Sequence, residues 1–159
     1  MTDTFGMSDY RIEKVRQRVG LTLASGARLE GDIFLQAFAR FRAGPEEPLD
    51  VLNEPAPFLP LLLQDGGLHL VHKAQIAVVA TPLPETDELA EPGVIGMHVQ
   101  VTMAHGHVLS GSIFPEVRAD RPRLVDFLNN TPLRFLPMFS TDELLILNIA
   151  HIAHARPTA

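Results

Sequence analysis

The chain has 159 residues, of which 46% are hydrophobic and 20% charged, a composition that supplies a packed core and excludes a disordered chain. Its formal net charge of −6 gives no long-range attraction to phosphate backbones and argues against a general nucleic-acid binder. The absence of cysteine excludes disulfides and thiolate metal sites.

Residues 1–18 are predicted to form a polar tail followed by a short helix. Ser8 is placed to cap a helix over residues 10–18. The first ten residues lack the apolar centre of a signal peptide, and no run reaches the roughly 18 apolar residues of a spanning helix. We therefore expect a cytoplasmic protein with no membrane partner.

Residues 19–80 and 98–159 contain an internal repeat. Residues 21–34 align without a gap with residues 101–114, and seven of the paired residues are identical. Further matches follow in the same order: 49–53 with 125–129, 58–60 with 135–137, and 74–77 with 150–153. So many landmarks in one order predict two copies of one small domain.

Each copy is predicted to contain five short strands and one helical turn. Period-two alternation indicates a first strand that ends at a turn with Gly26 or Gly106, where a positive φ is required. The returning strand contains Gly31 or Gly111, which is typical of a bulge or a sharp bend. The predicted strands are 19–23, 28–35, 58–63, 68–72 and 76–80 in the first copy, and 98–103, 108–114, 135–139, 144–147 and 152–155 in the second; the helical turns are 49–53 and 124–129. This spacing favours a small, strongly bent barrel.

The two copies are joined by residues 81–97, a Pro-rich stretch with four carboxylates and no apolar periodicity. We predict that it is a solvated linker.

The first copy resembles the Sm-like family, especially its bacterial Hfq-type branch. The resemblance rests on Arg28-Leu-Glu-Gly-Asp-Ile33 and on the run from Leu70 through His72-Lys73 to Pro82. It implies a mainly β fold of two tandem five-stranded Sm-like (SH3-like) barrels, and it implies RNA binding. The second copy departs from the pattern because Asn148-Ile149 replaces His72-Lys73. The whole pattern is more similar to uncharacterised bacterial small-barrel domains with no assigned activity.

Several polar residues are candidate ligand or partner contacts. One interpretation is that the recurring Asp and Asn of the helical turns contact a ligand; the favoured one is that Asp caps the turn and Asn closes it locally. The resemblance implies that His72-Lys73 lines a nucleotide pocket, whereas the favoured interpretation is an exposed, solvated Lys in a tight turn between two strands. Three arginines form a basic loop suited to an anion or to plain solvent. The candidates are Asp50, Asn53, His72, Lys73, Arg118, Arg121, Arg123, Asp126 and Asn129.

The sequence gives no support for catalysis or for a cofactor. His105 and His107 flank a hairpin glycine and could share one face, but a third ligand is not evident, so we predict no metal site. There is no nucleophile elbow, phosphate-binding glycine loop or paired-carboxylate motif.

The expected function is therefore non-enzymatic binding or assembly, through edge strands or loops, with a protein partner or by self-association into an oligomer. The alternative is RNA or nucleotide binding, which the resemblance implies and the acidic charge disfavours. A ligand pocket between the two copies is a third hypothesis.

Overall fold

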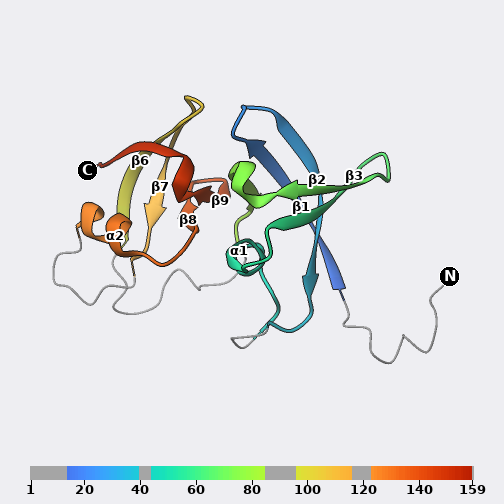
Figure 1. Ribbon diagram of the computed structural model, residues 1–159. Coiled ribbons are helices and arrows are strands. Elements are labelled where there is room, and N and C mark those ends of the chain that lie inside the picture. The colour runs from blue at the N-terminus through green and yellow to red at the C-terminus, as the bar shows by residue number, and fades with distance from the viewer. Residues whose placement is uncertain (1–13, 40–43, 85–95, 116–122, 159) are drawn as a thin grey trace.

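The computed structural model describes residues 14–39, 44–84, 96–115 and 123–158. Within them, ten strands form one antiparallel sheet in the order β10-β6-β7-β8-β9-β5-β1-β2-β3-β4 (Figure 1). The strands are β1 (Lys14–Leu23), β2 (Arg28–Gln36), β3 (Phe58–Leu63), β4 (Leu68–His72), β5 (Ile76–Pro82), β6 (Met97–Met103), β7 (Val108–Ile113), β8 (Phe135–Phe139), β9 (Glu143–Asn148) and β10 (Ile152–Pro157). The helices are α1 (Pro48–Asn53) and α2 (Leu124–Asn130), with 3₁₀ turns η2 (Lys73–Gln75) and η4 (Ile149–His151).

The mainly β prediction is confirmed, and the same order of elements occurs twice along the chain. The first half runs β1 to β5 and the second β6 to β10, and each half arranges its strands in the same spatial order: last, first, second, third, fourth. The sheet is not closed. It continues from one half into the other through pairing of β5 with β9, and it ends at β10 and β4. The finding is thus one open sheet, and it does not establish two separate barrels.

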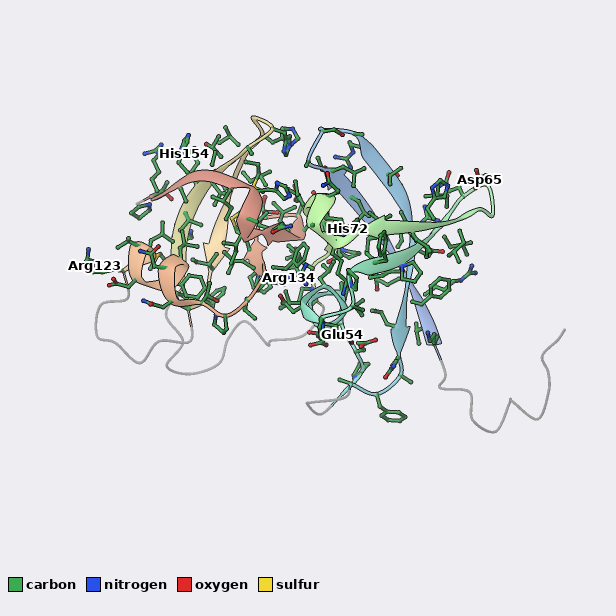
Figure 2. All side chains as sticks on the ribbon, viewed as in Figure 1. Glu54, Asp65, His72, Arg123, Arg134 and His154 are labelled. Atoms are coloured by element: carbon green, nitrogen blue, oxygen red, sulfur yellow. The ribbon has the colours of Figure 1, made fainter. Side chains whose placement is uncertain are left out.

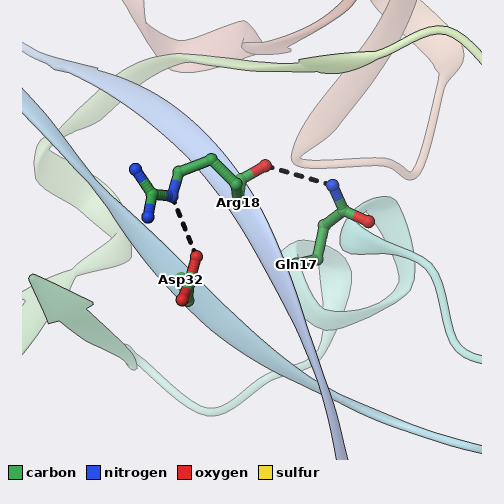
Figure 3. Close-up of polar contacts among 3 residues, drawn as sticks. All are labelled: Gln17, Arg18 and Asp32. Carbon is green, nitrogen blue, oxygen red and sulfur yellow. Dashed lines mark hydrogen bonds and ion pairs between the residues drawn. The ribbon is translucent and has the colours of Figure 1, made fainter. Parts of the chain in front are cut away.

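The predicted helix over residues 10–18 is wrong for its described part. Residues 14–18 belong to β1 and pair with β2, from Lys14 opposite Gln36 to Arg18 opposite Asp32. Arg18 also donates from Nε to Asp32 Oδ1 at 2.9 Å across this pair (Figure 3). A ladder partner therefore overrides the weak local helix preference of this polar segment. Residues 10–13 lie outside the described part.

The turn glycines of the β1–β2 and β6–β7 hairpins have the backbone conformation that their positions predict. Gly26 and Gly106 have φ values of 92° and 102°, the left-handed region that the turn needs. Gly31 lies in β2 beside β3, and Gly111 lies in β7 beside β8. The pairing of β2 with β1 and of β7 with β6 continues through these glycines without a bulge. A Cβ on Gly111 would lie 2.7 Å from the Phe139 carbonyl oxygen, so close backbone approach explains the glycine.

Two apolar cores lie on the sheet, and each takes side chains from both halves. The first is built mainly from β1, β2, β3 and α1, and it includes Phe135 and Ile146 of the second half. The second is built mainly from β6, β7, β8 and β9, and it includes Ala77 and Val78 of the first half. The halves therefore share apolar packing as well as a strand ladder.

The predicted linker 81–97 falls mostly outside the described residues. At its ends, Thr81 and Pro82 belong to β5 and Met97 belongs to β6. No helix in the described part of the chain is both long and apolar enough to cross a bilayer.

Candidate functional site

The joint between the two halves shows how an edge of this fold binds another strand. β5 and β9 pair antiparallel over five positions, from Val78 opposite Leu147 to Pro82 opposite Glu143. Six of the ten side chains in the paired stretch are buried, and those of Pro82 and Glu143 at its end are exposed. Antiparallel ladders satisfy every backbone donor and acceptor between the two strands. The joint is therefore a sealed edge-to-edge contact.

Two large side chains of the second half anchor the joint. Phe135 and Ile146 have no exposed surface and pack into the first half's core, which also contains Leu52 of α1 and Val79 of β5. Fully burying a side chain of this size is worth about 1.5–3 kcal/mol. Apolar burial, in addition to the ladder, therefore holds the two halves together.

Asn53 clamps the same joint with hydrogen bonds. Its Oδ1 accepts from the backbone N–H groups of Arg134 and Phe135, at 3.1 and 2.9 Å, and its Nδ2 donates to the Phe135 carbonyl at 3.2 Å. The side chain thus binds the start of β8, more than 80 positions away in the chain. The favoured local role for Asn53 is wrong, because its partners lie in the other half.

The far end of the joint carries a second set of polar contacts. Asn148 donates from Nδ2 to the Ile76 carbonyl at 2.9 Å, while its Oδ1 accepts from the Ala150 N–H at 3.0 Å. His151 Nε2 lies 2.6 Å from the Ala74 carbonyl oxygen, so this nitrogen is the donor. Side-chain hydrogen bonds therefore close the joint at both ends of the paired stretch.

Lys73 is enclosed, contrary to the interpretation of an exposed turn residue. Its side chain is 1% exposed, and Nζ donates to the carbonyls of Val51 and Glu54 at 2.6 and 3.1 Å, where α1 ends. Burial lowers the pKa of Lys73; the nearby Glu54 opposes this shift and Arg134 adds to it. Figure 2 shows Glu54 and Arg134 near each other below the joint. The lysine thus fastens α1 to the sheet beside the joint.

The neighbouring His72 ends β4 and remains exposed. Its Nδ1 accepts from the Ala74 N–H at 3.1 Å, as Asn148 accepts from Ala150 in the second half. In the neutral ring, Nε2 must then carry the proton and is free to donate. His72 and Lys73 are adjacent in sequence but separate in role, so the structure does not bring them together into one pocket wall.

The aspartates of the two helices have structural contacts. Asp50 accepts from the Glu47 N–H at 2.8 Å and completes a capping box at the start of α1. Asp126 lies 3.7 Å from Arg123 Nε, and both of these side chains are mostly exposed. Arg118 and Arg121 lie outside the described residues. Asn129 is exposed, and its side chain has no hydrogen bond to another described residue.

At the open β4 edge, the residues equivalent to the two apolar anchors of the joint are exposed to solvent. Phe58 and Leu70 hold in β3 and β4 the places that Phe135 and Ile146 hold in β8 and β9, as the matching registers show. They are 49% and 64% exposed, whereas Phe135 and Ile146 are fully buried. Leu68 beside them is also exposed. Exposed apolar side chains beside an unpaired edge make this face a candidate binding surface.

The opposite edge, β10, is more polar. His154 and Arg156 are exposed there, at the places that Val78 and Ala80 hold in β5. Figure 2 shows His154 on the second half and His72 on the first half, near the middle of the molecule. In the strand order, β10 and β4 stand at the two ends. The two open edges therefore lie at opposite ends of the sheet and differ in chemistry.

The β6–β7 hairpin places two histidine side chains close together. The rings of His105 and His107 lie 5.2 Å apart, and burial together with His107 and His151 lowers the pKa of His105. Among the described residues, no group of three or more acidic or histidine side chains is placed to hold a metal ion.

Comparisons with protein-family models, with curated proteins and with solved structures found no match to this chain. The candidate site is therefore defined by its own geometry. It consists of the open edge of β4, with Phe58, Leu68 and Leu70, and the open edge of β10. The sequence contains one signal for this surface, the apolar run 58–63, but the same run is equally typical of a buried strand.

Proposed function

We propose that the chain is a non-enzymatic assembly protein that binds protein partners by adding a strand at β4 or β10, and that each half is one Sm-like small-barrel unit. The observation that carries the proposal is the contrast between equivalent edges. The edge that has a partner, β9, buries Phe135 and Ile146, whereas the edge that has none, β4, exposes Phe58 and Leu70. Adding a strand to an open edge is a common mode of peptide recognition.

The described contacts give RNA binding no comparable support. Lys73, the cation that the Hfq-type resemblance offers for a nucleotide, already donates to two carbonyls of α1. Arg123 is exposed but faces Asp126. No described feature therefore favours a second function.

A labelled peptide tests the proposal. The peptide of residues 74–82 contains β5, the strand that β9 binds, and should add to the β4 edge in the same way. Fluorescence anisotropy should show saturable binding that Leu70→Lys weakens, because a charge then faces the added strand's apolar side chains. The matched control is Val108→Lys, since Val108 is a similarly exposed apolar residue on β7, which has strand neighbours on both sides. Equal binding by a scrambled peptide, or no effect of Leu70→Lys, would contradict the proposal.

A further inference from the structure

We infer that residues 14–18, the start of β1, form a further binding edge, which takes an extended acidic segment of a partner protein as an added strand. This site is separate from the β4 and β10 edges and goes beyond the function proposed for them. The pairing of β1 with β2 begins at Lys14, whereas its pairing with β5 covers only residues 20–23. Among the described residues, no strand therefore pairs with the β5 side of residues 14–18.

The alternation of the β1–β2 ladder shows which backbone groups are open on this side. The Leu23 N–H donates to the Ala27 carbonyl at 2.8 Å, and the pairing with β2 continues from there without a bulge. Odd-numbered residues of β1 therefore bond to β2, and even-numbered residues point their N–H and C=O groups to the other side. The open groups belong to Lys14, Arg16 and Arg18.

A proline explains why β5 does not cover this edge. Gly20 pairs with Ala80, so the next hydrogen-bonded position of the same register places Pro82 opposite Arg18. Pro82 has no N–H to donate to the Arg18 carbonyl, and proline in this position ends a ladder. The edge is therefore left open by the sequence of β5 itself.

The three residues with open backbone groups also carry positive side chains on one face. Alternate residues of a strand share a face, so Lys14, Arg16 and Arg18 form a row, and all three are exposed. Exposed Arg28 extends this row, because its Nη2 lies 3.3 Å from the position that a Cβ on Gly20 would take. Four cations thus follow one another along the open edge of a chain whose formal net charge is −6.

The row is only partly neutralised by the chain. Glu30 and Asp32 lie on the same face of β2, opposite Gly20 and Arg18. Asp32 pairs with Arg18 at 2.9 Å (Figure 3), whereas the other three cations have no ion pair to a described residue. Four positive side chains against two negative ones leave an excess of positive charge, which favours an acidic partner.

The second half shows that the fold does not need this row. Residues 94–98 are the counterparts of 14–18 in the repeat, and they read Val94-Ile-Gly-Met-His98 without a Lys or Arg. β6 starts at Met97 and is covered by the last strand almost to that point, since the Thr158 N–H donates to the His98 carbonyl at 2.8 Å. The long, basic start of β1 is therefore a feature of the first half alone, which favours a role in binding over a role in folding.

An added strand meets both the charges and the open backbone groups. Residues directly opposite each other in an antiparallel pair share a face, so carboxylates at every second position of the partner would face Lys14, Arg16 and Arg18. The residues between them would lie on the other face, beside Val15, which is 55% exposed. The fitting partner is thus a segment in which acidic residues alternate with apolar ones. A nucleic acid or a lipid headgroup could meet the cations, but it could not pair with both the open N–H and the open C=O groups.

A labelled peptide, Thr-Glu-Val-Glu-Val-Glu-Thr with blocked ends, tests the inference by fluorescence anisotropy. Binding should be saturable at low salt and weaken as salt is added. Arg16→Glu should weaken it roughly tenfold or more, because the new carboxylate faces a glutamate of the peptide. Arg123→Glu is the matched control, since it makes the same change of net charge at an exposed residue of the second half. Leu70→Ser should also leave binding unchanged, which separates this site from the β4 edge. Far-ultraviolet circular dichroism checks that each variant is folded.

Methylation of the peptide backbone distinguishes strand pairing from attraction between charges. Each glutamate is expected opposite a residue whose backbone groups are open, so the N–H of the central glutamate points at β1 and that of each valine points away. N-methylation of the central glutamate should therefore abolish binding, whereas N-methylation of the first valine should be tolerated.

Several results would overturn the inference. They are no binding at low salt, equal binding of a peptide of the same composition with its glutamates in one block, and equal binding after N-methylation of the central glutamate. Equal weakening by Arg16→Glu and Arg123→Glu would place the site elsewhere. Binding of phosphatidylglycerol vesicles or single-stranded RNA without binding of the peptide would assign the row to another class of partner. The peptide of residues 74–82 tests the β4 edge independently, so the proposed function can stand or fall separately.

Discussion

Replacing Asn53 by alanine should destabilise the protein far more than the same change at Asn129. Asn53 makes three hydrogen bonds to the backbone of Arg134 and Phe135, and the Phe135 side chain beside them is fully buried. A hydrogen bond of this kind contributes about 0.5–1.5 kcal/mol, and a buried N–H left without a partner costs about 1–3 kcal/mol. We expect Asn53→Ala to lower the free energy of unfolding by about 2–4 kcal/mol.

Urea denaturation followed by circular dichroism measures this difference directly. Asn129→Ala is the matched control, because Asn129 occupies the equivalent place in α2 and its side chain bonds no described residue; the cost of this variant should stay within about 0.5 kcal/mol. Asn53→Asp keeps the oxygen that accepts two bonds and should fall between wild type and Asn53→Ala. Equal costs for the alanine variants at Asn53 and Asn129 would refute the assignment of Asn53 as the clamp of the joint.

Three further results are expected. Lys73 has a lowered pKa in the folded protein, so between that value and the ordinary 10.5 the unfolded chain binds more protons and stability rises with pH, by at most about 1.4 kcal/mol per pH unit. Urea titrations at increasing pH up to 10.5 should show a slope that Lys73→Met removes. Gly31→Ala should cost about 1–3 kcal/mol in thermal unfolding because its Cβ would collide with the backbone of β3, whereas at Gly20 the nearest atom is the mobile end of an arginine and alanine should cost less. Arg18→Ala should cost less than about 1 kcal/mol, and less still at high salt, since the Arg18 side chain is 53% exposed; a larger cost would show that its ion pair with Asp32 is not a surface contact.

The individual strands could be predicted because their signals are local. Alternating apolar residues mark β1 and β6, and glycines with positive φ mark the turns at Gly26, Gly66 and Gly106, so the strands and short helices lie close to their predicted positions. The segment 14–18 is the exception. Its sequence suits a helix, and only the ladder with β2, a contact between distant parts of the chain, makes it a strand.

The joint could not be predicted for the same physical reason. Nothing near β5 or β9 in the sequence indicates that the two strands pair with each other. The role of Asn53 depends on that pairing, since its side chain bonds to the backbone of Arg134 and Phe135, at the start of β8. The burial of Lys73 likewise depends on α1 folding back over η2, so a lysine in a predicted turn becomes an enclosed donor. Long-range contacts decided each of these roles.

Equivalent residues in the two halves can be compared to separate the effect of the local sequence on burial from the effect of the surrounding structure. Phe58 and Phe135 are the same residue at the same place in the same kind of strand, yet one is half exposed and the other fully buried. Local structure cannot cause this difference, so the packing of Phe135 into the core of the first half must. The internal joint is favoured further because its halves are tethered and act at a high effective concentration.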